Sequence, residues 1–250
     1  HGMTFGSLAL TTDRCSRDAA GQSLPNVTHI PAPYMFPGFD TIGYMERLLT
    51  DDHSGVEKPA AVILETVQAD GGIYVFEENW LRDLRELCDR HDILLIVDEV
   101  QTGVGRTGSL FAFQQYDLLP DVCSFAKGIA GGMPMSGIMA NEKCRAVLTP
   151  GTHATTFGGN PVCAAAGLVV QETMDDAFLA EVTAKGEYLR QQIARHCGIA
   201  ANVNMPYLNK YLNKLLTGIY GESYTAAASA SDPANMRVKI MELLSDEIFV

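Results

Sequence analysis

Short apolar runs alternate with helix-patterned segments along most of the chain. Residues 60–66, AAVILET, and residues 93–100, ILLIVDEV, predict buried strands, and residues 121–128 and 135–141 supply two further short runs. The run ILLIVDEV is apolar almost throughout, so we expect a strand that is covered on both faces. Strands that alternate with helices in this way favour an α/β fold with a mostly parallel sheet.

The helical segments carry their own signals. Residues 79–92, NWLRDLRELCDRHD, place Trp80, Leu84 and Cys88 on one helix face, with Leu81 and Leu87 beside them. Residues 159–170, GNPVCAAAGLVV, open a helix with Asn160 as the predicted N-cap and Pro161 at the first helical position. From about residue 200 the composition changes to a short helical pattern and an Ala/Ser-rich run, which resembles nothing upstream.

Composition and charge narrow the class of partner. At 250 residues and 47% hydrophobic, the chain can bury a large core. Its net charge is -12 and it has no run of Lys or Arg, which argues against nucleic acid or an anionic membrane surface as partner. No apolar run reaches the roughly 18 residues of a membrane span, and we expect no signal peptide.

The cysteines indicate a reducing compartment. Six cysteines are spread along the chain without CxxC or CxxH spacing, which predicts neither a zinc site nor a disulfide scaffold. We therefore expect a cytoplasmic protein without a bound metal, in which the glycosylation sequon at Asn26 has no use. The chain begins at His1 without an initiator methionine, so it is expected to be part of something longer.

The stretch ILLIVDEVQTGVGRTG supports two incompatible interpretations. Gly103, Gly105 and Gly108 have the spacing G-x-G-x-x-G, which after a buried strand is typical of a dinucleotide-binding turn and would suggest a nicotinamide-dependent dehydrogenase. Such a turn belongs to the first βα unit and needs an acidic residue about 20 residues later. Here the turn follows at least two strands. The residues near the required offset are Phe125 to Lys127, and none of them is acidic. A flexible glycine turn is the favoured interpretation.

The other interpretation rests on Asp98 and Lys127. Asp98 ends one predicted strand, where a carboxylate needs a cationic partner, and Lys127 ends the next apolar run, in SFAKGIAGGMP. Small and apolar neighbours predict a desolvated lysine with a depressed pKa, suited to Schiff-base chemistry. Taken singly, each residue is more simply a turn cap or a solvated lysine. Together they supply the amine and the anion that pyridoxal phosphate requires.

Three long motifs carry a family resemblance. Residues 65–108, then PDVCSFAKGIAGGMP, then GTHATTFGGNP stand in the order and spacing of the class III (ω-amino) pyridoxal-phosphate aminotransferases of fold type I. The segments FAKGIAGGMPMSGIM and THATTFGGNPVCAAAG most resemble the corresponding sequences of the acetylornithine aminotransferases in that family. The resemblance implies the large cofactor-binding domain of that fold over residues 1–197, and it stops there.

The resemblance also implies roles for single residues. Lys127 would bind the cofactor aldehyde and move the substrate proton, while Asp98 would keep the pyridine nitrogen protonated. Gln101 would contact the ring's phenolic oxygen, although a polar turn residue is an equal alternative. Thr156 would reach the cofactor phosphate from the neighbouring subunit, which implies a homodimer.

Two acidic residues would lie near the substrate. Glu65 and Asp70, in ETVQADGG, correspond to acidic residues at the substrate end, and the second is a glutamate in most relatives. That glutamate pairs with a substrate-binding arginine, so the shorter Asp70 puts the switch between two substrates in question.

The implied reaction moves a terminal amino group from an N-acetylornithine-like donor to 2-oxoglutarate, as in arginine biosynthesis. Ornithine, 4-aminobutyrate or diaminobutyrate is the alternative donor, and an inactive fragment is the alternative of a different class.

Several parts of the family's site fall outside this sequence. They are an aromatic residue that stacks on the ring, a phosphate-binding helix start, an N-terminal substrate segment and a small C-terminal domain with a carboxylate-binding arginine. Residues 198–250 do not resemble that small domain and are expected to form an atypical tail. We therefore expect weak cofactor attachment and no measurable glutamate formation by this chain alone.

Overall fold

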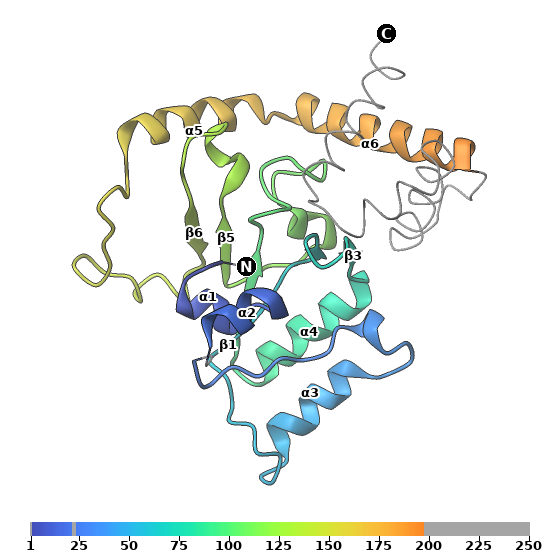
Figure 1. Cartoon of the computed structure of the whole chain (residues 1–250), viewed down its shortest axis with the longest axis vertical. Coiled ribbons are helices and arrows are strands. Elements are labelled where there is room, and N and C mark those ends of the chain that lie inside the picture. Colours follow the sequence, from blue (N-terminus) through green and yellow to red (C-terminus); the bar gives the residue numbers. More distant parts are fainter. Residues whose placement is uncertain (1, 22–23, 198–250) are drawn as a thin grey trace. The chain divides into compact units, whose positions relative to one another are not determined.

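A computed structural model describes residues 2–21 and 24–197 of the chain, and the expected tail of residues 198–250 lies outside the described residues. The elements below belong to the first of two units, His1–Glu187, and the last helix continues past its end. The strands are β1 (Ala61–Leu64), β2 (Val67–Gln68), β3 (Tyr74–Val75), β4 (Leu94–Asp98), β5 (Val122–Phe125) and β6 (Gly137–Ala140) (Figure 1).

Six α-helices and three short 3-10 helices (η) connect and flank these strands in the described residues. The α-helices are α1 (Phe5–Leu10), α2 (Arg14–Ala20), α3 (Thr41–Thr50), α4 (Glu78–Arg90), α5 (Pro161–Thr173) and α6 (Asp176–Cys197). The 3-10 helices are η1 (Pro33–Met35), η2 (Ala112–Tyr116) and η3 (Lys127–Ala130).

The strands confirm the predicted α/β class. Four of them form one sheet in the order β1-β4-β5-β6, in which β1, β4 and β5 are parallel. The last strand, β6, runs antiparallel to β5, a direction that the hydrophobic pattern did not reveal. A separate antiparallel pair, β2 and β3, follows β1 directly.

The main core lies between the sheet and α4. Leu95 and Val97 are fully buried, and they pack in one cluster with the predicted apolar face of α4. In turn, α3 packs against α4, and the indole nitrogen of Trp80 donates a hydrogen bond of 2.7 Å to the hydroxyl of Thr41. The helix face predicted from periodicity is therefore confirmed.

The expectation that β4 is covered on both faces is wrong. Leu94 and Ile96, whose side chains alternate with those of Leu95 and Val97, are only half-buried. Their neighbour on β1, Ile63, is 39% exposed. An apolar run alone does not distinguish full cover from one covered face, because either environment accepts aliphatic side chains.

The start of α5 matches its prediction. The side chain of Asn160 accepts hydrogen bonds from the backbone N–H groups of Val162 and Cys163, with Pro161 at the first helical position. An N-cap of this kind satisfies donors that the helix itself leaves without partners.

Glu99 holds the glycine-rich turn that follows β4. Its carboxylate is fully buried and accepts hydrogen bonds from the N–H groups of Ala112 (3.0 Å) and Phe113 (2.8 Å), and from the hydroxyl of Thr102. The N–H of Gly103 donates to the backbone oxygen of Glu99, and a Cβ atom at Gly103 would lie 2.6 Å from that oxygen. Gly103 therefore serves the close packing of this turn.

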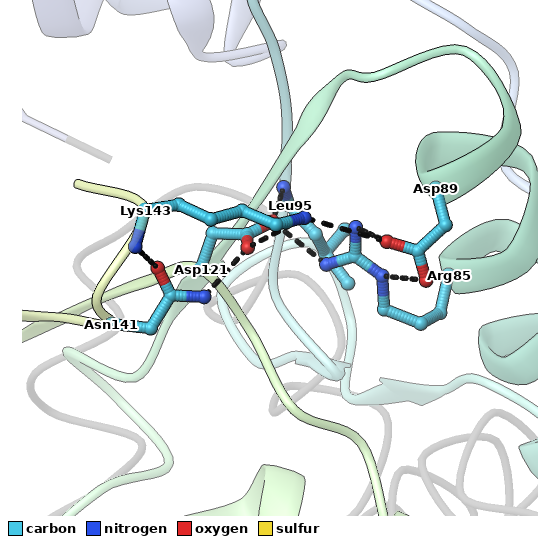
Figure 2. Close-up of polar contacts among 6 residues, drawn as sticks. All are labelled: Arg85, Asp89, Leu95, Asp121, Asn141 and Lys143. Carbon is cyan, nitrogen blue, oxygen red and sulfur yellow. Dashed lines mark hydrogen bonds and ion pairs between the residues drawn. The ribbon is translucent and has the colours of Figure 1, made fainter.

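Asp121 connects strands β4, β5 and β6 with α4 at the amino end of the parallel strands, opposite to the turn that Glu99 holds. It precedes β5 and is 2% exposed. Its side chain accepts from the N–H of Leu95 (2.8 Å), from Arg85 (2.8 Å) and from the amide of Asn141 (2.7 Å), as Figure 2 shows. The Lys143 ammonium lies 3.6 Å from the same carboxylate. Burial opposes ionisation, but the hydrogen bonds from Leu95, Arg85 and Asn141 outweigh it and lower the pKa of Asp121.

Replacing Asp121 by Ala is expected to lower the free energy of unfolding by about 1–3 kcal/mol, because it removes the side-chain acceptor of the buried Leu95 N–H, while Arg85 keeps its ion pair with Asp89. Denaturant unfolding of the chain measures this change. Asp83→Ala, at an exposed position of α4, is the matched control and should change stability by less than about 0.5 kcal/mol. Equal stability of the two variants would show that the network contributes little.

Replacing Glu99 by Gln is expected to destabilise the turn by about 1–3 kcal/mol, because an amide NH₂ then faces backbone donors that need acceptors. Amide hydrogen exchange at Ala112 and Phe113 should accelerate with the loss of stability. Glu86→Gln, which is exposed on α4, provides the control. Unchanged exchange at both amides in Glu99→Gln would contradict this role.

Candidate functional site

Asp98 ends β4 at the carboxyl edge of the parallel strands. It is 7% exposed, and its Oδ1 atom accepts hydrogen bonds from the N–H of Val100 (2.9 Å) and the hydroxyl of Ser124 (3.2 Å). Ser124 is also its register partner on β5. These two hydrogen bonds fix the orientation of the Asp98 side chain at the end of β4.

Lys127 follows β5, the strand next to β4. It opens η3 two residues after the strand ends, with a φ angle of 49° in the left-handed region that non-glycine residues seldom adopt. The pairing of β4 with β5 confirms that the carboxylate and the lysine stand at the ends of adjacent strands. Strained backbone of this kind is concentrated at functional sites.

The expected desolvation of Lys127 is wrong for this chain. Its side chain is exposed, and Gly128 beside it is exposed as well. The chain turns out of the sheet after Phe125, so the apolar residues that precede Lys127 in the sequence do not enclose its side chain.

Glu65 lies beside Asp98. It follows β1 directly, is half-buried, and accepts a hydrogen bond of 3.4 Å from the N–H of Ala69. Burial, and then the negative charge of Asp98, raise the pKa of Glu65 to about 7. Asp70 stands in the turn between β2 and β3 and is exposed, and its charge raises the pKa of Glu65 further.

A cavity of about 820 Å³ opens beside these carboxylates. Glu65, Gln68 and Asp98 line it together with strand β1 and with residues 26–32. Near its rim Tyr34 stacks on Tyr74, with ring centroids 3.7 Å apart, and donates a hydrogen bond of 2.9 Å to the side-chain oxygen of Gln68. Sequence patterns did not single out Gln68 or the two tyrosines, because their partners are 34 to 40 residues away.

Three of the predicted residues, Lys127, Gln101 and Thr156, are not among the residues that line this cavity. Gln101 is half-buried in the turn after β4, and Thr156 is exposed in the segment between β6 and α5. Glu99, which sequence reasoning passed over, is a structural carboxylate beside the site, and its position next to Asp98 at the end of an apolar run was the available signal. In residues 2–21 and 24–197, no group of three or more His, Cys, Asp or Glu residues could hold a metal ion. No helix within those ranges has the length and apolar character needed to cross a membrane.

Comparison with known proteins identifies the larger part of the chain. Residues 1–198 match the family model described as aminotransferase class-III. The diaminobutyrate–2-oxoglutarate transaminase of Bordetella parapertussis is 46% identical over 76% of this chain and 44% of its own length. The acetylornithine aminotransferase of Corynebacterium efficiens is 41% identical over 80% of this chain and 47% of its own length. The chain thus spans about half the length of these relatives.

Solved structures agree with the sequence comparison. An aminotransferase of Bacillus anthracis matches 79% of this chain and 48% of its own with a TM-score of 0.70 at 29% identity. An ornithine aminotransferase of Toxoplasma gondii, whose structure has pyridoxal phosphate at partial occupancy, matches 78% of this chain and 43% of its own with a TM-score of 0.65 at 29% identity.

The C-terminal part of the sequence gives a different match. Residues 175–249 match the model described as the N-terminal domain of RecC, which covers less than a third of the chain and overlaps the aminotransferase match at residues 175–198. The aminotransferase match covers most of the chain, including the strand ends that bear Asp98 and Lys127. The chain therefore belongs to the class-III aminotransferases, a family of pyridoxal-phosphate enzymes of fold type I.

Proposed function

We propose that this chain provides the cofactor-binding part of an aminotransferase that moves a terminal amino group from an N-acetylornithine-like donor to 2-oxoglutarate. The observation that carries the proposal is the placement of Asp98 and Lys127 at the carboxyl ends of the adjacent parallel strands β4 and β5. Ligand sites of open α/β sheets form at this edge.

The residues present fit pyridoxal phosphate. The cofactor needs an anion at its pyridine nitrogen and an amine at its aldehyde. Asp98 supplies a buried carboxylate fixed by two donors, and Lys127 supplies an exposed amine that a ligand can reach. When bound, pyridoxal phosphate supplies an electron-withdrawing ring and an aldehyde that condenses with amines.

The chain's own residues would then divide the work. Asp98 holds the ring nitrogen in its protonated form, and Lys127 accepts and returns a proton at the amine-bearing carbon of the substrate. Gln101, in the turn after β4, would contact the phenolic oxygen. Thr156 would donate its hydroxyl to the phosphate of a second subunit in a homodimer, and its exposure in the single chain is consistent with this role.

The donor is the finer part of the proposal. The sequences of the Lys127 and Thr156 motifs resemble acetylornithine aminotransferases and support N-acetylornithine as the donor. The 46% identity to a diaminobutyrate transaminase favours diaminobutyrate as the second candidate. The shorter side chain of Asp70 bears on this choice. Supplying the chain with excess pyridoxal phosphate and each donor in turn separates them by the half-reaction, which requires no glutamate formation, since the accepted donor converts the cofactor to pyridoxamine phosphate.

Borohydride reduction of the chain incubated with pyridoxal phosphate is expected to attach a pyridoxyl group to Lys127, because its amine follows β5 at the strand edge that bears Asp98. Peptide mapping by mass spectrometry locates the label. Lys127→Ala should abolish labelling at this position, while Lys185→Ala, exposed on α6, should leave it intact. Labelling of Lys143 in preference to Lys127 would contradict the assignment.

Replacing Asp98 by Asn is expected to weaken pyridoxal phosphate binding at least about tenfold, because a charge-assisted hydrogen bond contributes roughly 1.5–3 kcal/mol. The absorption spectrum during cofactor titration gives the dissociation constant. Asp83→Asn removes the same charge from an exposed position of α4 and should leave the affinity unchanged. An Asp98→Asn variant with native affinity would mean that another group holds the ring nitrogen.

A further inference from the structure

Three polar side chains form a row across the carboxyl edge of the sheet. Leu64 of β1 is the register partner of Val97 of β4, so the next residues, Glu65 and Asp98, are neighbours on adjacent strands. Asp98 is in turn the register partner of Ser124 on β5. Register partners of parallel strands point to the same face, with backbones about 4.8 Å apart. Glu65 and Asp98 therefore stand side by side, and both line the cavity.

The two carboxyl groups are in unequal environments. Asp98 accepts hydrogen bonds from Val100 and Ser124, which stabilise its negative charge. Glu65 is desolvated and feels that charge, and its pKa is raised to about 7, mainly by burial and then by Asp98. When like charges lie this close in a partly buried site, one of the two groups holds its proton to a higher pH.

Other groups around Glu65 also influence its pKa, and the charge of Glu65 in turn affects Tyr34. The charge of Asp70, in the turn between β2 and β3, also raises its pKa, whereas the N–H of Ala69 lowers it. The pKa of Tyr34, on η1, is raised by burial, by Tyr74 and by the negative charge of Glu65. Asp98 is the group whose charge a bound cofactor would compensate.

We propose that Glu65 is a positioning residue whose proton is coupled to the charge at Asp98, so that a cation paired with Asp98 makes Glu65 release its proton to solvent. The inference rests on the proposed function for the identity of that cation, the protonated ring nitrogen of pyridoxal phosphate. The balance is simple: a neutral Glu65 becomes a carboxylate, one proton leaves, and no bond other than O–H breaks. Asp98 keeps its hydrogen bonds from Val100 and Ser124.

The direction of the pH dependence follows from linkage. A ligand whose binding releases a proton binds more tightly as the pH rises through the pKa of the releasing group, and it lowers that pKa in return. Affinity for the cofactor should therefore increase between about pH 6 and pH 8 by more in the native chain than in Glu65→Gln. The proton also matters for folding, because a carboxyl group whose pKa is raised in the folded state makes the chain less stable as the pH rises from about 4.5 to 7.

The first experiment needs no cofactor. Carbon-13 NMR of the chain with labelled glutamate side chains follows each carboxyl group with pH, and the resonance missing from Glu65→Gln identifies Glu65. Its midpoint is expected near pH 7 in the native chain and lower in Asp98→Asn, where burial still keeps it above 4.5, while Glu86→Gln leaves it unchanged. A midpoint near 4.5 in the native chain, or one that Asp98→Asn does not move, overturns the proposal.

The second experiment measures the released proton. Calorimetric titration with pyridoxal phosphate at pH 6.5 in two buffers of different ionisation enthalpy counts the protons released, and the native chain should release up to one more than Glu65→Gln. Equal release by both chains overturns the coupling to the cofactor. If pyridoxal phosphate does not bind at all, the proposed function fails, and the NMR titrations alone then decide whether Glu65 and Asp98 are coupled.

Discussion

The arrangement of the strands in the sheet depends on the hydrogen bonds of the buried residue Asp121. Its backbone N–H donates to Leu95 on β4, its backbone oxygen accepts from Asn141 after β6, and its side chain binds both of these residues and Arg85 of α4. A buried charge is tolerated only where partners surround it. A shift of register by one residue would remove those partners, so the arrangement of β4, β5, β6 and α4 is fixed together.

The register set at that edge determines what meets at the other. With Ile96 paired to Val122, Asp98 must face Ser124, and Lys127 must follow at the exit of β5. The two edges carry carboxylates in opposite conditions. Asp121 has an arginine and several hydrogen-bond donors as partners. Glu65 instead stands beside Asp98, and burial together with the negative charge of Asp98 raises the pKa of Glu65. Stability is thus concentrated at the amino edge of the parallel strands, and the unfavourable charge is concentrated at the carboxyl edge, where a ligand can relieve it.

The chain belongs to the class-III aminotransferases, and the family match includes the carboxyl edge of the sheet with Asp98 and Lys127. The family match ends near residue 198, and the chain spans about half the length of its relatives, so the donor and the subunit arrangement belong to the proposal. The match of residues 175–249 to a RecC domain is in keeping with the change of composition near residue 200. The glycines of the turn after β4 have a local purpose, because Glu99 and Leu110 bind the backbone of that turn.

The sequence by itself determined the α/β class, the apolar face of α4, the cap of α5, and the placement of Asp98 and Lys127 at strand ends. These features follow from periodicity and from motifs, which act over a few residues or have a fixed spacing. The tertiary structure alone decided the antiparallel direction of β6, the partial cover of β4, the exposure of Lys127, and the placement of Glu65 beside Asp98. Each of these depends on which strands become neighbours, because strand pairing, burial and charge coupling arise between residues 12 or more positions apart, and no local pattern encodes that choice.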